Sequence, residues 1–214
     1  MDQIPLRGAG GDPPPLTRRA AAKAQTRTRV MEAARRLFAE RGYEAATIRD
    51  IAAEAGLSTG AVFASFRDKT DLFNEVIITD VERFAAAVPP VDPASSTHDA
   101  LLATFGAGYA LNIDELSLIQ AALGFSWQRD RASEARAREG EIHLIRQVED
   151  ILRRGVARGE LSQTLDLRLV SSMLWASYIA NYRQAIFDGW DVNALRSRMS
   201  DQIRLLLDGA RAAA

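Results

Sequence analysis

From Ala24 onward, the apolar residues in the first part of the chain recur at the spacing of amphipathic helices. One stripe has members at offsets of three, four, seven and eight residues: Val30, Ala33, Ala34, Leu37 and Phe38. This pattern predicts a helix that ends at Gly42, because glycine readily adopts the left-handed conformation that closes many helices. Three further helices are expected at about residues 48–55, 59–66 and 69–87.

The two short helices among these carry polar residues of the kind that begin helices. Thr47, followed three residues later by Asp50, is close to a capping box, and Ser58 or Thr59 is expected to cap the next helix. Gly56 lies between the two helices and supplies a left-handed position for a tight turn. Two short helices joined by an Ala-Gly-Leu-Ser turn behind a longer helix predict a helix-turn-helix unit.

Three prolines, Pro89, Pro90 and Pro93, interrupt the helical pattern and predict a loop. After this loop, five further helical segments are expected: residues 98–112, 114–129, 133–158, 166–187 and 192–210. No stretch alternates between apolar and polar residues as a half-buried strand does, and no Asn-Gly hairpin turn occurs. The expected fold class is therefore all-α.

The chain is expected to divide into three parts. Proline and glycine are frequent in residues 1–17, which we expect to form a disordered tail. Residues 18–68 are expected to form the helix-turn-helix domain, with its recognition unit at residues 47–66. Residues 69–214 are expected to form a second, larger helical domain.

The net charge of the chain is −1, but its charges are unevenly distributed. Residues 18–43 contain eight basic and two acidic residues, a local charge of +6. Residues 76–214 contain 15 basic and 18 acidic residues, a local charge of −3. A basic first helix is what binding to DNA phosphates requires, although an exposed helix can also be rich in arginine without any partner.

Several classes of protein are disfavoured by what the sequence lacks. The chain has no cysteine, two histidines far apart, no glycine-rich phosphate loop and no metal-ligand spacing, which argues against an enzyme, a metal site or a cofactor. No apolar run reaches the roughly 18–20 residues that span a bilayer, and the N-terminus does not have the pattern of a signal peptide. We therefore expect a cytoplasmic protein that has no contact with membranes.

The residues from Thr26 to Phe73 resemble the DNA-binding domain of the TetR family of transcriptional regulators. The shared residues occur in a fixed order: Thr26-Arg27, Ala33, Ala34, Leu37-Phe38, Gly42-Tyr43, Thr47, Ile51-Ala52, Ala55-Gly56-Leu57-Ser58, Gly60, Phe66, Lys69 and Leu72. The resemblance implies a homodimeric repressor, or less often an activator. Its two helix-turn-helix units would lie in successive major grooves of a palindromic double-stranded DNA operator, about 34–36 Å apart.

The resemblance also implies which residues meet DNA. Arg49 and Thr59 match positions that reach base edges, and the arginine fork is suited to guanine. Thr47, Ser58 and Lys69 match positions that contact phosphate. All three lie at expected helix N-termini, where backbone N–H groups and the helix dipole attract anions.

Four further residues complete the expected DNA-binding set. Gly60 would permit a close approach of the backbone to DNA. Arg27 belongs to the basic segment Arg18–Arg29, which would lie along the phosphate backbone or enter a minor groove. Phe63 and Ser65 stand where the family usually has tyrosine and His or Tyr, so hydroxyl contacts to phosphate are lost. Weaker affinity or an unusual operator preference is expected.

An alternative function rests on the same departures from the family pattern. Ala61, Phe63 and Ser65 offer few polar contacts to DNA. A helical adaptor that keeps the helix-turn-helix fold but acts through a protein partner therefore stays open.

In the family, the central helices of the second domain surround a cavity for an effector, and we expect a small, mostly apolar one. Aromatic stripes at helical spacing belong more often to a core, but several together can enclose such a molecule. The expected ligand-binding residues are Phe105, Tyr109, Asn112, Trp127, Trp175, Tyr178 and Tyr182. Ligand binding would shift the fourth helix and change the separation of the recognition helices. The charged run Arg129–Glu141 has no apolar stripe and is expected to be a solvated helix or loop.

The last two expected helices have more apolar residues than one buried stripe requires. The penultimate helix is apolar on more than one face: Leu169, Val170, Met173, Leu174, Trp175, Tyr178 and Ile179. A helix with a second apolar face needs a second surface to pack against, and a homodimer provides one. The resemblance implies the same two helices for dimerisation.

Overall fold

The computed structural model describes residues 18–88, 90, 92 and 94–210, which form nine α-helices and one 3₁₀ turn and contain no strand. The elements are α1 (Arg18–Ala45), α2 (Ile48–Glu54), α3 (Thr59–Phe63), α4 (Lys69–Ala87), α5 (Thr97–Asn112), η1 (Ile113–Glu115), α6 (Leu116–Ser126), α7 (Arg131–Ala157), α8 (Leu167–Asp188) and α9 (Val192–Asp208). The all-α fold class is confirmed. The expected tail at residues 1–17 and two of the loop prolines, Pro89 and Pro93, lie outside the described residues.

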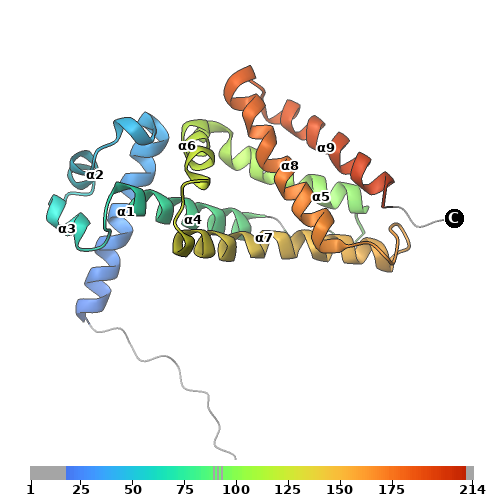
Figure 1. The fold of residues 1–214 in the computed structure, drawn as a ribbon, viewed down its shortest axis with the longest axis horizontal. Helices are drawn as coiled ribbons and strands as arrows, with labels where there is room; N and C mark the ends of the chain where they lie inside the picture. The colour runs from blue at the N-terminus through green and yellow to red at the C-terminus, as the bar shows by residue number, and fades with distance from the viewer. Residues whose placement is uncertain (1–17, 89, 91, 93, 211–214) are drawn as a thin grey trace, which may run out of the picture.

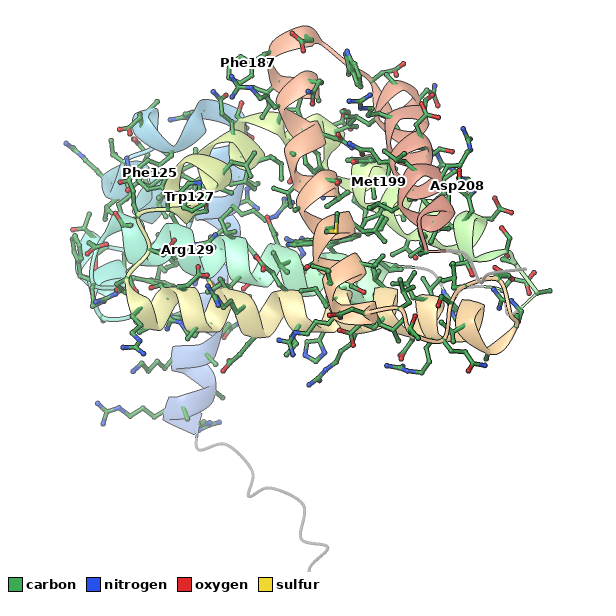
Figure 2. The ribbon with its side chains drawn as sticks, turned by 45° about the vertical axis from the view of Figure 1, so that its right-hand side comes forward. Phe125, Trp127, Arg129, Phe187, Met199 and Asp208 are labelled. Atoms are coloured by element: carbon green, nitrogen blue, oxygen red, sulfur yellow. The ribbon has the colours of Figure 1, made fainter. Side chains whose placement is uncertain are left out.

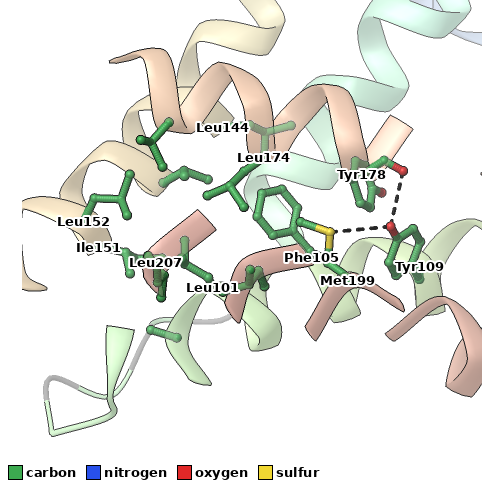
Figure 3. Packing of buried hydrophobic residues seen from close by; sticks show 14 of the residues in the cluster. Leu101, Phe105, Tyr109, Leu144, Ile151, Leu152, Leu174, Tyr178, Met199 and Leu207 are labelled. Atoms are coloured by element: carbon green, nitrogen blue, oxygen red, sulfur yellow. Dashed lines mark hydrogen bonds between the residues drawn. The ribbon is translucent and has the colours of Figure 1, made fainter. Parts of the chain in front are cut away.

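Two groups of buried side chains organise the helices. The first group joins α1, α2, α3 and the first half of α4, and it is centred on Phe38 and Phe73. The second group joins the end of α4 to α5, α7, α8 and α9, and it includes Phe105 and Tyr178 (Figure 3). Helix α4 belongs to both groups, since Phe73 lies in the first and Phe84 in the second.

Helices α4 and α7 lie side by side between the two ends of the molecule (Figure 1). The guanidinium of Arg136 pairs with the Glu75 carboxylate at 2.9 Å, and the Gln147 amide donates to the carbonyl of Ala85 at 3.3 Å. Later residues of α7 therefore meet later residues of α4, so the two helices run parallel. Helix α6 packs against α1 and contributes Leu118 to the first buried group.

The helix ends follow the local signals, with two differences in length. Gly42 leaves the helical conformation at φ 76° as expected, but one more turn continues to Ala45. The third helix ends at Phe63 rather than near Phe66, whose ring is nevertheless buried. The first turns of α1 project beyond the other helices, and they carry the exposed basic residues Arg18, Arg19 and Lys23 (Figure 1).

Candidate DNA-binding face and effector cavity

Two capped helices and a glycine turn set the orientation of α3. The Thr47 hydroxyl accepts the backbone N–H of Asp50 at 3.2 Å, and the Asp50 carboxylate accepts that of Thr47 at 3.3 Å. Hydrogen bonding to the Thr47 hydroxyl also holds the pKa of Asp50 below its ordinary value. Gly56 has a φ of 63°, and the Ser58 hydroxyl accepts the N–H of Ala61 at 3.2 Å. The predicted caps and left-handed turn are confirmed.

The outward face of α2 and α3 holds most of the expected DNA contacts. Thr47, Arg49, Ser58, Thr59 and Gly60 are all exposed. Among the described residues, nothing forms a hydrogen bond or ion pair with the guanidinium of Arg49 or the hydroxyl of Thr59. Both side chains are therefore available to a partner outside the chain.

Gly60 and Phe63 form the middle of this face. A Cβ atom added to Gly60 would come no closer to the protein than 3.7 Å, from the Ser58 hydroxyl oxygen, so no internal contact requires glycine here. Glycine inside a helix is nevertheless about 1 kcal/mol less favourable than alanine. The Phe63 ring is 54% exposed, which leaves an apolar surface at the centre of the face.

Arg27 makes contacts within the domain, although 36% of its side chain is exposed. Its guanidinium donates to the carbonyl of Ser65 at 3.0 Å, forms an ion pair with Glu75, and lies 4.3 Å from the centre of the Phe66 ring. These contacts tie α1 to the segment after α3 and to α4. Arg27 is therefore placed to position the recognition helix, and the half-buried Ser65 takes part through its backbone carbonyl.

Lys69 and Arg29 make similar internal contacts. The Lys69 ammonium donates to the carbonyl of Glu44 at 3.3 Å and lies 4.1 Å from the centre of the Tyr43 ring. Arg29, which we did not single out from the sequence, donates to the carbonyl of Ala55 at 2.5 Å. It holds α1 against the end of α2, next to the turn at Gly56.

A cavity of about 600 Å³ lies between α4, α6, α7 and α8, with Asn112 of α5 at one side. Five of the seven expected ligand-binding residues line it: Asn112, Trp127, Trp175, Tyr178 and Tyr182. Trp127 lies on the segment between α6 and α7 and is 94% exposed (Figure 2). The volume is within the range of small-molecule sites.

Phe105 and Tyr109 do not line this cavity, which corrects two of the expected positions. Both are buried in the second group of core residues (Figure 3). The Tyr109 hydroxyl donates to the carbonyl of Tyr178 at 3.3 Å and accepts the amide of Asn181 at 3.0 Å. The reason is packing, since their face of α5 is covered by α8 and α9 and its polar group is already paired.

Charged residues from the run Arg129–Glu141 also line the cavity, although most of the run is exposed, as expected of a solvated helix. Helix α7 begins within the run, and Glu134, Arg138 and Glu141 recur on it at the i, i+4, i+7 spacing of one face. Arg129 joins them from the preceding segment, and only 11% of its side chain is exposed (Figure 2). The i, i+4, i+7 spacing of these charged residues could have indicated that they share one face of a helix. The run has no apolar stripe, so the sequence did not indicate that this face borders a cavity.

One polar cluster outside these sites has the residue types of a hydrolase triad. The His98 ring contacts the Asp99 carboxylate at 3.1 Å through Nδ1 and the Ser200 hydroxyl at 3.0 Å through Nε2. The Asp99 side chain is 70% exposed, however, and neither His98 nor Ser200 lines the cavity. The contact joins the start of α5 to α9, and the hydrogen bond from His98 lowers the pKa of Asp99.

These features define a helix-turn-helix domain joined to a helical domain that contains a cavity. Residues 30–76 match the family described as bacterial regulatory proteins of the tetR family. The match covers the helix-turn-helix segment, about a fifth of the chain, so it is this segment that is similar to the tetR family.

One curated relative is the HTH-type transcriptional repressor Rv1474c of Mycobacterium tuberculosis, to which the chain is 46% identical over 63 residues. That alignment covers 29% of this chain and 34% of the relative, so it spans about a third of the relative's length.

Among the described residues, no helix is both long enough and apolar enough to cross a membrane.

Solved structures with the same fold cover nearly the whole chain at low sequence identity. FadR from Bacillus subtilis in complex with stearoyl-CoA superposes with a TM-score of 0.68 at 19% identity, covering 86% of this chain and 99% of that one. A transcriptional regulator from Saccharomonospora viridis in complex with choline gives a TM-score of 0.68 at 22% identity, covering 85% and 96%. These similarities support the fold.

Proposed function

We propose that the protein is a sequence-specific transcriptional regulator that binds a palindromic operator as a homodimer and is released by a small effector. The observation that carries this proposal is the exposed face of α2 and α3, where Arg49 and Thr59 have no partner among the described residues and Gly60 has no internal need to be glycine. Such a face fits the major groove. A regulator of chromosomal DNA would work in the cytoplasm.

Helix α4 supplies a physical connection between the DNA-binding face and the cavity. Its first half packs into the DNA-binding domain, while Ile77, Asp80 and Phe84 line the cavity. The carboxylate of Asp80 also accepts Arg35 of α1 at 2.8 Å, and Arg35 pairs with Glu115 of η1 as well. An effector that moves α4 would therefore also move α1, and a coupling of about 1–3 kcal/mol is enough to change operator occupancy substantially.

The proposed DNA contact of Arg49 is testable by selecting bound duplexes from a random library. The wild-type chain is expected to select a palindrome with half-sites about 34–36 Å apart. Arg49→Ala should bind the selected site about tenfold less tightly and lose its preference at one base pair of each half-site, since a bidentate contact contributes about 1–3 kcal/mol. Arg153→Ala, which changes an exposed arginine of α7, is the matched control. An unchanged preference after Arg49→Ala would remove Arg49 from the base contacts.

The proposed dimer uses the outward faces of α8 and α9. Leu169, Met173 and Phe187 of α8 and Leu205 of α9 are 44–76% exposed, although large apolar side chains are usually buried. The small residues Ala176 and Ala180 continue the same face of α8 and allow a close approach. A second copy of the chain, which presents the same apolar face, is the occupant that we propose for this surface.

Met173→Arg is expected to raise the dissociation constant of the homodimer by at least about tenfold, because it introduces a charge into a desolvated interface. Analytical ultracentrifugation of the full chain measures this shift. Ile142→Arg, a change of an exposed apolar residue on α7, should leave the dimer intact. A wild-type chain that is monomeric at micromolar concentration would contradict this part of the proposal.

One observation favours a second candidate function, the helical adaptor. The exposed ring of Phe63 gives the middle of α3 an apolar surface that suits a protein partner. The two functions differ in one respect that is easily measured, since an adaptor binds no DNA sequence in preference to bulk competitor DNA.

A further inference from the structure

The aromatic wall of the cavity is built around Tyr178. Its ring stacks with Trp175 at a centroid distance of 5.4 Å and with Phe84 at 5.8 Å, and it meets Tyr182 edge to face at 5.4 Å. The hydroxyls of Tyr178 and Tyr182 are hydrogen-bonded to each other at 2.8 Å. All four residues border the cavity. Aromatic faces carry partial negative charge and attract cations.

The acidic residues of the cavity differ in how their charge is balanced. The carboxylate of Asp80 pairs with Arg35 and Arg83, both at 2.8 Å. The carboxylate of Glu134 pairs with Arg138 at 2.7 Å and with Arg129 at 3.6 Å. Glu141 alone has neither a hydrogen bond nor an ion pair within the described part of the chain.

Glu141 is also largely removed from solvent. Burial raises the pKa of its carboxyl above the ordinary value; the charges of Arg129 and Arg138 oppose the shift, and the charge of Glu134 adds to it. A partly buried carboxylate without a direct partner is stabilised when a cation is placed against it. The position of such a cation would be the cavity that Glu141 shares with Trp175 and Tyr178.

We infer that the effector of the proposed regulator is an organic cation, a protonated amine or quaternary ammonium carried on an apolar body. The positive nitrogen would lie beside Glu141 and the ring of Trp175, with the apolar body against Leu118 and Leu123. This inference rests on the proposed function, because it identifies the ligand class of the same cavity.

An anionic head group is the main alternative, with Arg129 as its anchor. Arg129 is largely buried, but its charge already faces the carboxylate of Glu134 and acts on that of Glu141. An anion beside Arg129 would add another negative charge to this group and leave Glu141 without a partner. The two arginines and two glutamates of this group balance in formal charge, but Glu141 alone lacks a direct partner and a cation would supply one, so the contacts favour a cation.

The test compares two probes that share a tail and differ in head group, decyltrimethylammonium and decanoate. Isothermal titration calorimetry of the full chain is expected to show decyltrimethylammonium binding at least about tenfold more tightly than decanoate. Glu141→Gln keeps the shape of the side chain and should weaken decyltrimethylammonium binding by at least about tenfold while leaving decanoate unchanged or tighter. Glu139→Gln removes an exposed carboxylate two residues away on the same helix and should change neither affinity.

Three results would overturn the inference. They are decanoate binding as tightly as decyltrimethylammonium, binding of neither probe, or full cation affinity in Glu141→Gln. Trp175→Leu provides a second variant if Glu141→Gln does not fold, and it should weaken cation binding alone. DNA binding by the ligand-free chain is measured in parallel. Its absence would contradict the proposed function, whereas intact DNA binding without a cation preference would contradict only the ligand class.

Discussion

Gly108→Ala is expected to lower the free energy of unfolding by about 1–3 kcal/mol, the usual effect of overpacking a core. Gly108 is buried in α5, and an added Cβ atom would come within 2.4 Å of the Tyr178 hydroxyl and 2.6 Å of the Phe84 ring. Both side chains would have to move toward the cavity that they line. That movement would separate Tyr178 from Tyr182 and reduce the space for an effector.

Gly124→Ala is the matched control for this prediction. Gly124 also lies within a helix, α6, but an added Cβ atom would meet nothing within 4 Å. Alanine should therefore stabilise the protein by up to about 1 kcal/mol through helix propensity alone. Chemical denaturation of the two variants should give changes of opposite sign. A Gly108→Ala protein as stable as Gly124→Ala would show that the packing around Tyr178 is looser than described.

Gly60→Leu is expected to reduce operator affinity by about a hundredfold or more while leaving the fold intact. The protein has room for a side chain at this position, and leucine favours helix more than glycine does. A bulky group in the middle of the recognition face would hold α3 away from the base edges, so the polar contacts of Arg49 and Thr59 would be lost together.

Two measurements separate this effect from a loss of folding. The thermal midpoint of Gly60→Leu should equal or exceed that of the wild-type chain, and its dimer should persist in ultracentrifugation. Gly124→Leu, a change of the same kind on α6 and away from the recognition face, should bind the operator normally. Wild-type affinity in Gly60→Leu would mean that α3 does not approach DNA through this face.

The N-terminal helices were predictable because their signals are local. A cap acts within three residues, as Thr47 does with Asp50, and a left-handed turn needs only the glycine that adopts it. Apolar periodicity identified Phe38 as buried without knowledge of its partners. The length of α3 was less predictable, because Phe66 is buried by tertiary packing although it lies beyond the helix end.

The candidate site residues were less predictable than the N-terminal helices, because their positions depend on contacts between distant parts of the chain. Arg27 is expected to reach DNA, and its partners within the chain, Ser65 and Glu75, lie 38 and 48 residues away and cannot be read from its neighbours. Aromatic spacing could not separate Tyr109, which packs into the core, from Tyr178, which borders the cavity. Both are tyrosines in aromatic stripes at helical spacing. Only the packing of α5 against α8 and α9 determines which of them borders the cavity.

The most direct test of the central claim is a binding titration of the ligand-free chain on a labelled duplex from the region upstream of its own coding sequence. Binding is expected to survive an excess of bulk competitor DNA and to weaken steeply between about 50 and 200 mM salt, because phosphate contacts release counterions. Equal binding to the upstream duplex and to the competitor at every salt concentration would contradict this claim.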